Sequence, residues 1–181
     1  MKTKDYLIVA LAPLAVLIIP LVGHLTVEGW NWTWSDFVVA WVILALTTGF
    51  LRVLMTRRWS SLAYKAGAVL AVGAGFLIFW VNLAVQIIGD ENPGNLLYFL
   101  TLAGGLVGVA RSRCEPANLA RVAFGMAAVL LVIPAVSVLF WPTDFNPGYL
   151  KVQILSVCFA LVFAGSGLLF GRAAGETAVA G

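Results

Sequence analysis

The stretch from Leu119 to Trp141 is LARVAFGMAAVLLVIPAVSVLFW, and Arg121 is its only charged residue. A helix needs roughly 20 mostly apolar residues to cross about 30 Å of hydrocarbon. A barrel strand would instead show alternating polarity over about ten residues. The length and the unbroken apolar character of this stretch therefore predict a membrane-spanning helix.

Five further stretches have the same apolar character and nearly the same length. The six predicted spans cover residues 6–25, 36–55, 65–88, 93–111, 119–141 and 149–171, followed by a short tail at 173–181. Inside the hydrocarbon every backbone N–H and C=O must pair within its own segment, which favours helices. Because the connections are short, we expect an all-α integral membrane protein. Its fold would be a six-transmembrane-helix up-and-down bundle, forming one domain over residues 1–172.

The composition of the whole chain agrees with a membrane protein. Of its 181 residues, 62% are hydrophobic and 10% are charged, whereas soluble domains average about 25% charged residues. So few charges could not cover the surface of a soluble globule of this size. Soluble enzymes are therefore excluded, and the net charge of +3 does not indicate a nucleic-acid partner.

The basic residues fall almost entirely on one side of the predicted bundle. If the N-terminus is cytoplasmic, the only basic residue on the outer side is Lys151, one of eleven in the chain. The ten on the inner side are Lys2, Lys4, Arg52, Arg57, Arg58, Lys65, Arg111, Arg113, Arg121 and Arg172. Cytoplasmic loops of membrane proteins carry such an excess. We therefore expect both termini to be cytoplasmic.

One outer turn concentrates the polar residues of the chain. Asn82, Gln86 and Asp90 are spaced by four, which would place them on one helical face that climbs to the surface. Glu91 and Asn95 follow in the turn. In a functional interpretation, these five residues form an outward-facing pocket that binds a cation or a small polar solute through oxygen atoms.

The same turn also fits a structural interpretation. Asn92 is a good helix N-cap, Pro93 suits the first helical position, and acidic residues favour a helix N-terminus. Asn82 and Gln86 could simply hydrogen-bond neighbouring helices. The sequence leaves the binding site and the structural cap both open.

This segment carries a resemblance to a set of known proteins. The residues that carry it are Asn92-Pro93, Asn95-Leu96, Tyr98-Phe99 and, beyond the next inner loop, Leu119-Ala-Arg121. They resemble a signature in uncharacterised multi-pass bacterial inner-membrane proteins. The resemblance covers the third to fifth predicted spans. It implies a helical fold in the bacterial inner (cytoplasmic) membrane, and it implies no particular reaction.

Few other residues could carry chemistry. His24 is the only histidine, and with Asp36 and Asp144 it forms the set of outer-face candidates for a site. Ionisable residues deep in the bilayer mark proton relays and ion-coupled carriers, but Arg52 lies near enough to the inner surface to snorkel. One histidine and two separate cysteines leave too few ligands for haem or di-metal chemistry. We therefore predict no cofactor, no metal and no catalytic residue.

Three functions remain open from the sequence. The first is a non-catalytic accessory or structural protein, which could contact other membrane proteins or a second copy through small-residue helix faces. Those faces, which could equally pack within the chain, contain Gly67, Ala71, Gly75, Gly104, Gly108, Gly167 and Gly171. The second is a small channel or transporter with its recognition site at the outer turn. The third, an enzyme that acts on lipid, would need His24 beside an outer carboxylate.

Overall fold

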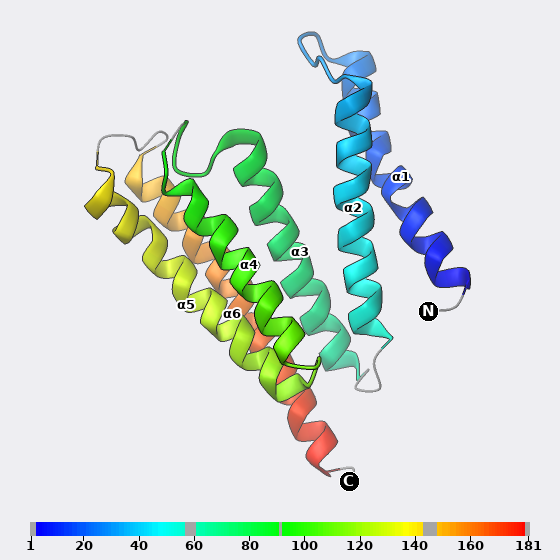
Figure 1. Cartoon of the computed structure of the whole chain (residues 1–181), viewed down its shortest axis with the longest axis vertical. Coiled ribbons are helices and arrows are strands. Elements are labelled where there is room, and N and C mark those ends of the chain that lie inside the picture. Colours follow the sequence, from blue (N-terminus) through cyan, green and yellow to red (C-terminus); the bar gives the residue numbers. More distant parts are fainter. Residues whose placement is uncertain (1–2, 57–60, 91, 143–147, 180–181) are drawn as a thin grey trace. The chain divides into compact units, whose positions relative to one another are not determined.

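The computed structural model describes residues 3–56, 61–90, 92–142 and 148–179, and these ranges contain six helices and no strand (Figure 1). The helices are α1 (Thr3–Thr26), α2 (Trp34–Met55), α3 (Leu62–Val85), α4 (Asn95–Arg111), α5 (Pro116–Phe140) and α6 (Tyr149–Val179). All except α4, which has 17 residues, are long and apolar enough to cross a membrane. The all-helical fold and these five helices indicate a multi-pass membrane protein.

The chain divides into two compact units. Unit 1 is Met1–Thr56 and contains α1 and α2, whereas unit 2 is Arg57–Gly181 and contains α3 to α6. Each unit has its own internal contacts and is described by itself. The single domain expected over residues 1–172 stays a prediction.

Unit 1 is an antiparallel pair of apolar helices that leaves most of its large side chains exposed. Two polar contacts join the helices. The Trp41 indole N–H donates to the Ala10 carbonyl at 3.2 Å, and the Arg52 guanidinium donates to the Asp5 carboxylate in an ion pair. Arg52 thus has an acidic partner on α1, and the expectation that it lies near enough to the inner surface to snorkel stays a prediction.

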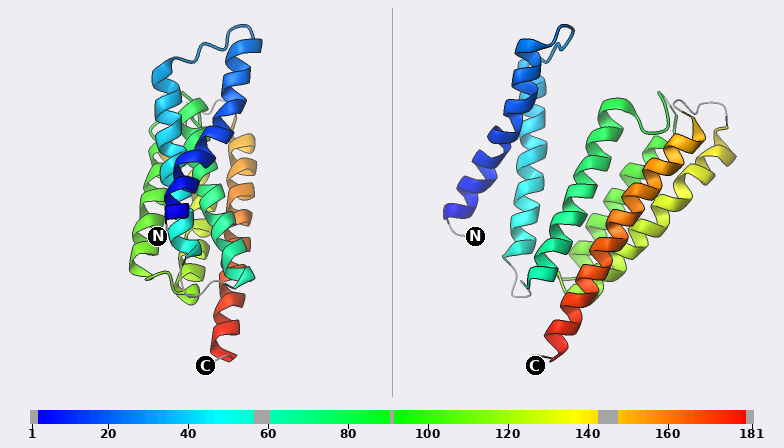
Figure 2. Two further views of the ribbon diagram at one scale, coloured as in Figure 1. Left: turned by 90° about the vertical axis from the view of Figure 1, so that its right-hand side faces the viewer. Right: turned by 180° about the vertical axis from the view of Figure 1, so that it is seen from behind.

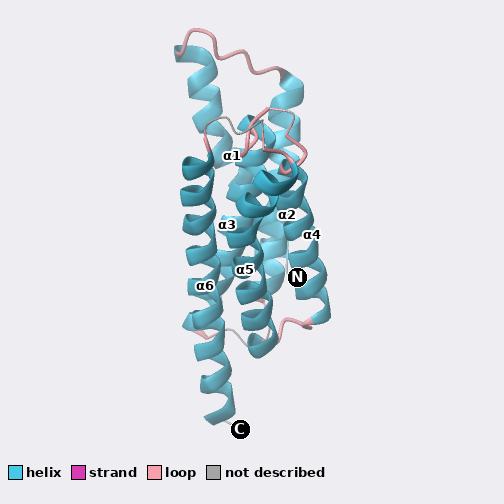
Figure 3. Ribbon diagram, turned by 90° about the vertical axis from the view of Figure 1, so that its left-hand side faces the viewer, coloured by secondary structure: helices cyan, strands magenta, loops and turns pink. Residues whose placement is uncertain are grey.

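Unit 2 is a four-helix bundle with a well-buried core. Helix α6 packs against α3 and α5, and α4 packs against α5 and α3, so the four helices form a closed ring of antiparallel neighbours (Figures 2 and 3). Each helix contributes a fully or almost fully buried side chain to one cluster: Ile78, Tyr98, Leu130 and Phe163. The up-and-down order expected from the short loops is present within this unit.

Small residues let the helices of unit 2 approach closely. The Ser166 hydroxyl on α6 donates to the Gly67 carbonyl on α3 at 2.8 Å. A Cβ added at Gly108 would lie 2.9 Å from the Val122 side chain on α5. Gly67 and Gly108 therefore serve packing inside the chain. Self-association through the small-residue faces stays a prediction.

The helix ends follow familiar capping rules, and several differ by a few residues from the predicted spans. Ser61 caps α3 by accepting a hydrogen bond from the Tyr64 N–H at 3.3 Å, and Pro116 begins α5. Helix α3 ends at Val85, earlier than predicted, whereas α6 continues beyond Gly171 through most of the predicted tail.

Candidate functional site at the turn between α3 and α4

The end of α3 decides how the predicted polar site is arranged. The helix stops at Val85 because Gln86 adopts a left-handed φ of 50°, which a right-handed helix cannot continue. Gln86 and Asp90 therefore lie beyond the helix. The continuous polar face expected for Asn82, Gln86 and Asp90 does not form.

Asn82, on the last turn of α3, points into the turn and is 2% exposed. Its side-chain N–H group donates to the Asn95 carbonyl at 2.9 Å. Its side-chain oxygen accepts a hydrogen bond from the Ile87 N–H at 3.2 Å. Both ends of this amide are thus bound to the backbone of its own chain.

Asn95, the first residue of α4, holds the same segment from the other side. Its side-chain oxygen accepts from the Ile88 N–H at 3.0 Å. Its side-chain nitrogen donates to the Gly89 carbonyl at 2.8 Å and makes a longer contact of 3.5 Å with the Gln86 side-chain oxygen. These bonds replace the helical ones that end at Val85, so buried backbone groups keep partners.

Asn92 shapes the entry into α4 differently from the N-cap that was expected. Its side-chain oxygen accepts from the Gly94 N–H at 2.8 Å, two residues later. The Asn95 N–H donates to the Asn92 carbonyl at 3.0 Å, and the Leu96 N–H donates to the Pro93 carbonyl at the same distance. A tight turn therefore precedes α4, which begins at Asn95. We call Asn82, Asn92 and Asn95 the asparagine network.

Gly94 brings this turn against α5. A Cβ at Gly94 would lie 2.5 Å from the Ser137 hydroxyl and 2.8 Å from the Ile88 side chain. No larger residue fits without a shift of the neighbouring atoms. The close approach at Gly94 locks the turn onto the body of unit 2.

The acidic part of the predicted site is placed differently from its amides. The structure brings together Asn82, Gln86 and Asn95, whereas Asp90 is exposed. Glu91 lies outside the described residues. The Asn82 and Asn95 amides therefore bind backbone groups, whereas the Asp90 carboxylate is exposed.

The other outer-face candidates have local partners in unit 1. The His24 ring donates from Nδ1 to the Trp30 carbonyl at 3.0 Å. At the start of α2, the Asp36 carboxylate accepts from the Thr33 N–H at 2.7 Å and from its hydroxyl at 2.8 Å, as N-terminal acidic residues often do. Asp144 falls outside the described residues.

Unit 2 also contains a buried hydroxyl pair that the sequence did not predict. The Tyr98 hydroxyl on α4 lies 2.7 Å from the Ser156 hydroxyl on α6, and both residues are 0% exposed. The Ser137 hydroxyl is also buried and has no hydrogen-bond partner in the described part of the chain. A hydroxyl within an apolar stretch is visible in the sequence, but its partner depends on how the helices are rotated in the bundle.

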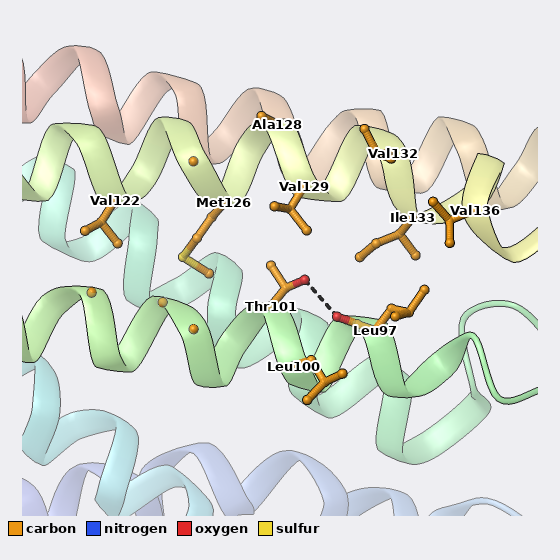
Figure 4. A pocket seen from close by; sticks show the side chains of 14 residues that line it. Leu97, Leu100, Thr101, Val122, Met126, Ala128, Val129, Val132, Ile133 and Val136 are labelled. Carbon is orange, nitrogen blue, oxygen red and sulfur yellow. Dashed lines mark hydrogen bonds between the residues drawn. The ribbon is translucent and has the colours of Figure 1, made fainter.

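A second feature of unit 2 is an apolar groove between α4 and α5 with a volume of about 700 Å³ (Figure 4). We call it the α4–α5 groove. Its lining includes Leu97, Thr101, Gly104 and Gly108 from α4 and faces Val122 to Val136 of α5. The only side-chain hydroxyl in the lining, on Thr101, donates to the Leu97 carbonyl at 2.7 Å. The groove thus offers shape and apolar contact and no free hydrogen-bonding group.

Together, these arrangements provide hydrogen bonds that hold helices and turns in place. Within the described residues no group of three or more His, Cys, Asp or Glu side chains is placed to hold a metal ion. The buried amides and hydroxyls are positioned by the packing of unit 2. The chain matches no protein-family model, and no curated protein or solved structure is found to be similar to it.

Proposed function

We propose that this protein is a non-catalytic accessory or structural component of the bacterial inner membrane. The observation that carries the proposal is the asparagine network, whose side-chain amides bind the backbone of their own chain. Buried polar groups that are satisfied in this way fix a rigid, specific structure. A rigid helical unit with an apolar exterior suits a protein that works by contacting other molecules in the membrane.

The charge distribution within each unit supports an orientation with both termini in the cytoplasm. In unit 2, Lys65, Arg111 and Arg121 lie at the end where α3 starts, α4 stops and α5 starts, whereas Lys151 lies at the opposite end. In unit 1, Lys4 and Arg52 both belong to the end where α1 starts and α2 stops. The positive-inside rule assigns these basic ends to the cytoplasm.

The transport alternative has weaker support. A solute site would need amide or carboxylate oxygens free to replace the hydration shell of a cation. Asn82 and Asn95 direct their side-chain oxygens to the N–H groups of Ile87 and Ile88. Binding of a solute by these two amides would therefore require the turn to open.

Purification from the native membrane tests the accessory role. The chain would carry an affinity tag and be extracted in mild detergent, with an equally abundant multi-pass protein bearing the same tag as control. We expect at least one membrane protein to copurify in a fixed stoichiometry with this chain and not with the control. The absence of any such partner, together with no membrane phenotype on deletion, would contradict the proposal.

Cysteine labelling tests the orientation independently. The background chain would carry Cys114→Ala and Cys158→Ala, with one new cysteine at Lys4, Lys151 or Glu176. A membrane-impermeant maleimide applied to intact spheroplasts should label Lys151→Cys alone. The Lys4→Cys and Glu176→Cys chains should react only after permeabilisation, and the opposite pattern would reverse the proposed topology.

A further inference from the structure

The α4–α5 groove is suited to an alkyl chain. It runs from Leu97, near the start of α4, to Gly108, near its end, along the facing side of α5 (Figure 4). The hydroxyl of Thr101, which lies in the lining, is already bonded to the backbone. A polar occupant would lose its hydrogen bonds to water without replacement, whereas an apolar one would lose nothing.

Missing side chains create the free space in this groove. A Cβ added at Gly104 or at Gly125 would have no neighbouring atom within 4 Å. One turn away from Gly104, the backbone at Gly108 is held close to Val122 of α5. The two helices are therefore in contact near one end of the groove, while the surface beside that contact stays open.

Basic side chains lie at one end of the same groove. Arg111 follows Gly104 and Gly108 at helical spacing, which places it on their face of α4. Arg121 precedes Gly125 by four residues and therefore shares its face of α5. Both arginines are exposed. They lie where α4 ends and α5 begins, beyond the Gly108 end of the groove.

The loop between α4 and α5 fixes a third arginine at this end. Arg113 and Cys114 have left-handed φ values of 51° and 61°. The Tyr64 hydroxyl donates to the Cys114 carbonyl at 3.2 Å, and the Cys114 N–H donates to the Ser112 hydroxyl at 3.1 Å. Such conformations persist where surrounding contacts impose them. Ser112 and Cys114 are thus turned inward, and Arg113 is exposed.

These arginines have capacity to bind an anion. The side chains of Arg111 and Arg113 make no hydrogen bond or ion pair with another residue in the described ranges. Arg121 donates one hydrogen bond to the Asn118 side chain at 3.0 Å, which leaves other guanidinium N–H groups available. The only acidic residue of the loop, Glu115, accepts a hydrogen bond from Asn118.

We propose that one anionic phospholipid occupies this site, with an acyl chain in the α4–α5 groove and its phosphate at Arg111, Arg113 and Arg121. Basic pockets between transmembrane helices bind anionic headgroups, and guanidinium groups match phosphate in geometry and charge. An apolar groove that ends at three exposed arginines favours a phospholipid over an uncharged helix as the occupant. The inference goes beyond the accessory role because it needs no protein partner.

Lipid titration of the purified full chain tests the charged part of the site. Native mass spectrometry would count bound dioleoylphosphatidylglycerol and, separately, dioleoylphosphatidylcholine. We expect one tightly bound lipid per chain, with preference for the anionic one. Arg111→Gln should weaken its binding by about fivefold, whereas Lys65→Gln, which removes a charge from the same end of unit 2, should not. Equal binding of both lipids, or equal loss in both variants, would overturn the headgroup assignment.

A second arm tests the groove itself. Gly104→Leu should fill open space and weaken binding of the long-chain anionic lipid, whereas Gly73→Leu, also at an open position but on α3, should not. If Gly104→Leu lowers the thermal stability, the groove is tested instead on the unchanged chain with the short-chain lipid dihexanoylphosphatidylglycerol. This lipid should bind more weakly than dioleoylphosphatidylglycerol. The groove assignment would be overturned if the binding affinity changed neither with the length of the acyl chain nor with Gly104→Leu. A dimer with no bound lipid would show that a second copy is the occupant instead.

Discussion

Units 1 and 2 hold their helices together in different ways. Unit 1 joins α1 and α2 through one indole hydrogen bond and the Asp5–Arg52 ion pair. Unit 2 has a buried cluster with a side chain from each helix, closed at one end by the asparagine network. The two polar contacts of unit 1 lie between otherwise exposed apolar helices, whereas the asparagine network and the Tyr98–Ser156 hydroxyl pair of unit 2 are buried.

The difference shows what stabilises helices in lipid. Hydrocarbon tails are as apolar as leucine, so burial of apolar surface gives little drive for helices to associate there. A two-helix unit must therefore depend on a few polar bonds. A four-helix unit adds close packing around small residues such as Gly67 and Gly108, and its polar bonds then fix the detailed geometry.

The largest effect should come from Asn95→Ala. This change leaves the buried Ile88 N–H and Gly89 carbonyl without their partners, which should lower the stability of unit 2 by about 3 kcal/mol. In a Cys158→Ala background, the reactivity of buried Cys114 would report the opening of unit 2. Asn118→Ala, at a half-buried position in the first turn of α5, serves as control. Unchanged Cys114 protection in the Asn95 variant would show that the network is not structural.

A smaller effect should follow from Arg52→Met in unit 1. The side chain of Asp5 is 9% exposed and that of Arg52 is 29% exposed. Because the buried Asp5 carboxylate would lose the Arg52 guanidinium, we expect the stability of the α1–α2 pair to fall by about 2 kcal/mol. The double variant Asp5→Asn with Arg52→Met should recover part of it. Spin-label distances between α1 and α2 would measure the change. Cys114 in unit 2 should be equally protected from labelling in all these chains. A loss of this protection would show that the stability of unit 2 depends on unit 1.

The smallest effect should come from Tyr98→Phe in the core of unit 2. One buried hydroxyl bond to Ser156 is lost, which should cost about 1 kcal/mol. Because Tyr98→Phe combined with Ser156→Ala removes both partners, the double variant should be no less stable than either single one. Thermal unfolding in detergent would check this order. Additive losses would show that the two hydroxyls act independently.

Asn82 and Gln86, which lie close together in the chain, show which features of the turn could be predicted from the sequence and which could not. The structural alternative for Asn82 predicted hydrogen bonds from its side chain, and such bonds are present. The predicted stacking of Asn82, Gln86 and Asp90 is wrong because Gln86 leaves the helical region of backbone space. A non-glycine residue with positive φ is uncommon. Here the side chains of Asn82 and Asn95 hold Gln86 in this conformation by bonding the backbone that follows it, at residues 87–89.

The helices could be predicted from the sequence because apolar length is a local property of each segment, and five of them are long and apolar enough to cross a membrane. The basic helix ends could be predicted as well, since charge can be counted without knowing contacts. The Arg52–Asp5 pair, the Tyr98–Ser156 contact and the groove between α4 and α5 could not be predicted in this way. These features depend on the rotation and spacing of packed helices, which residues distant in the chain set jointly.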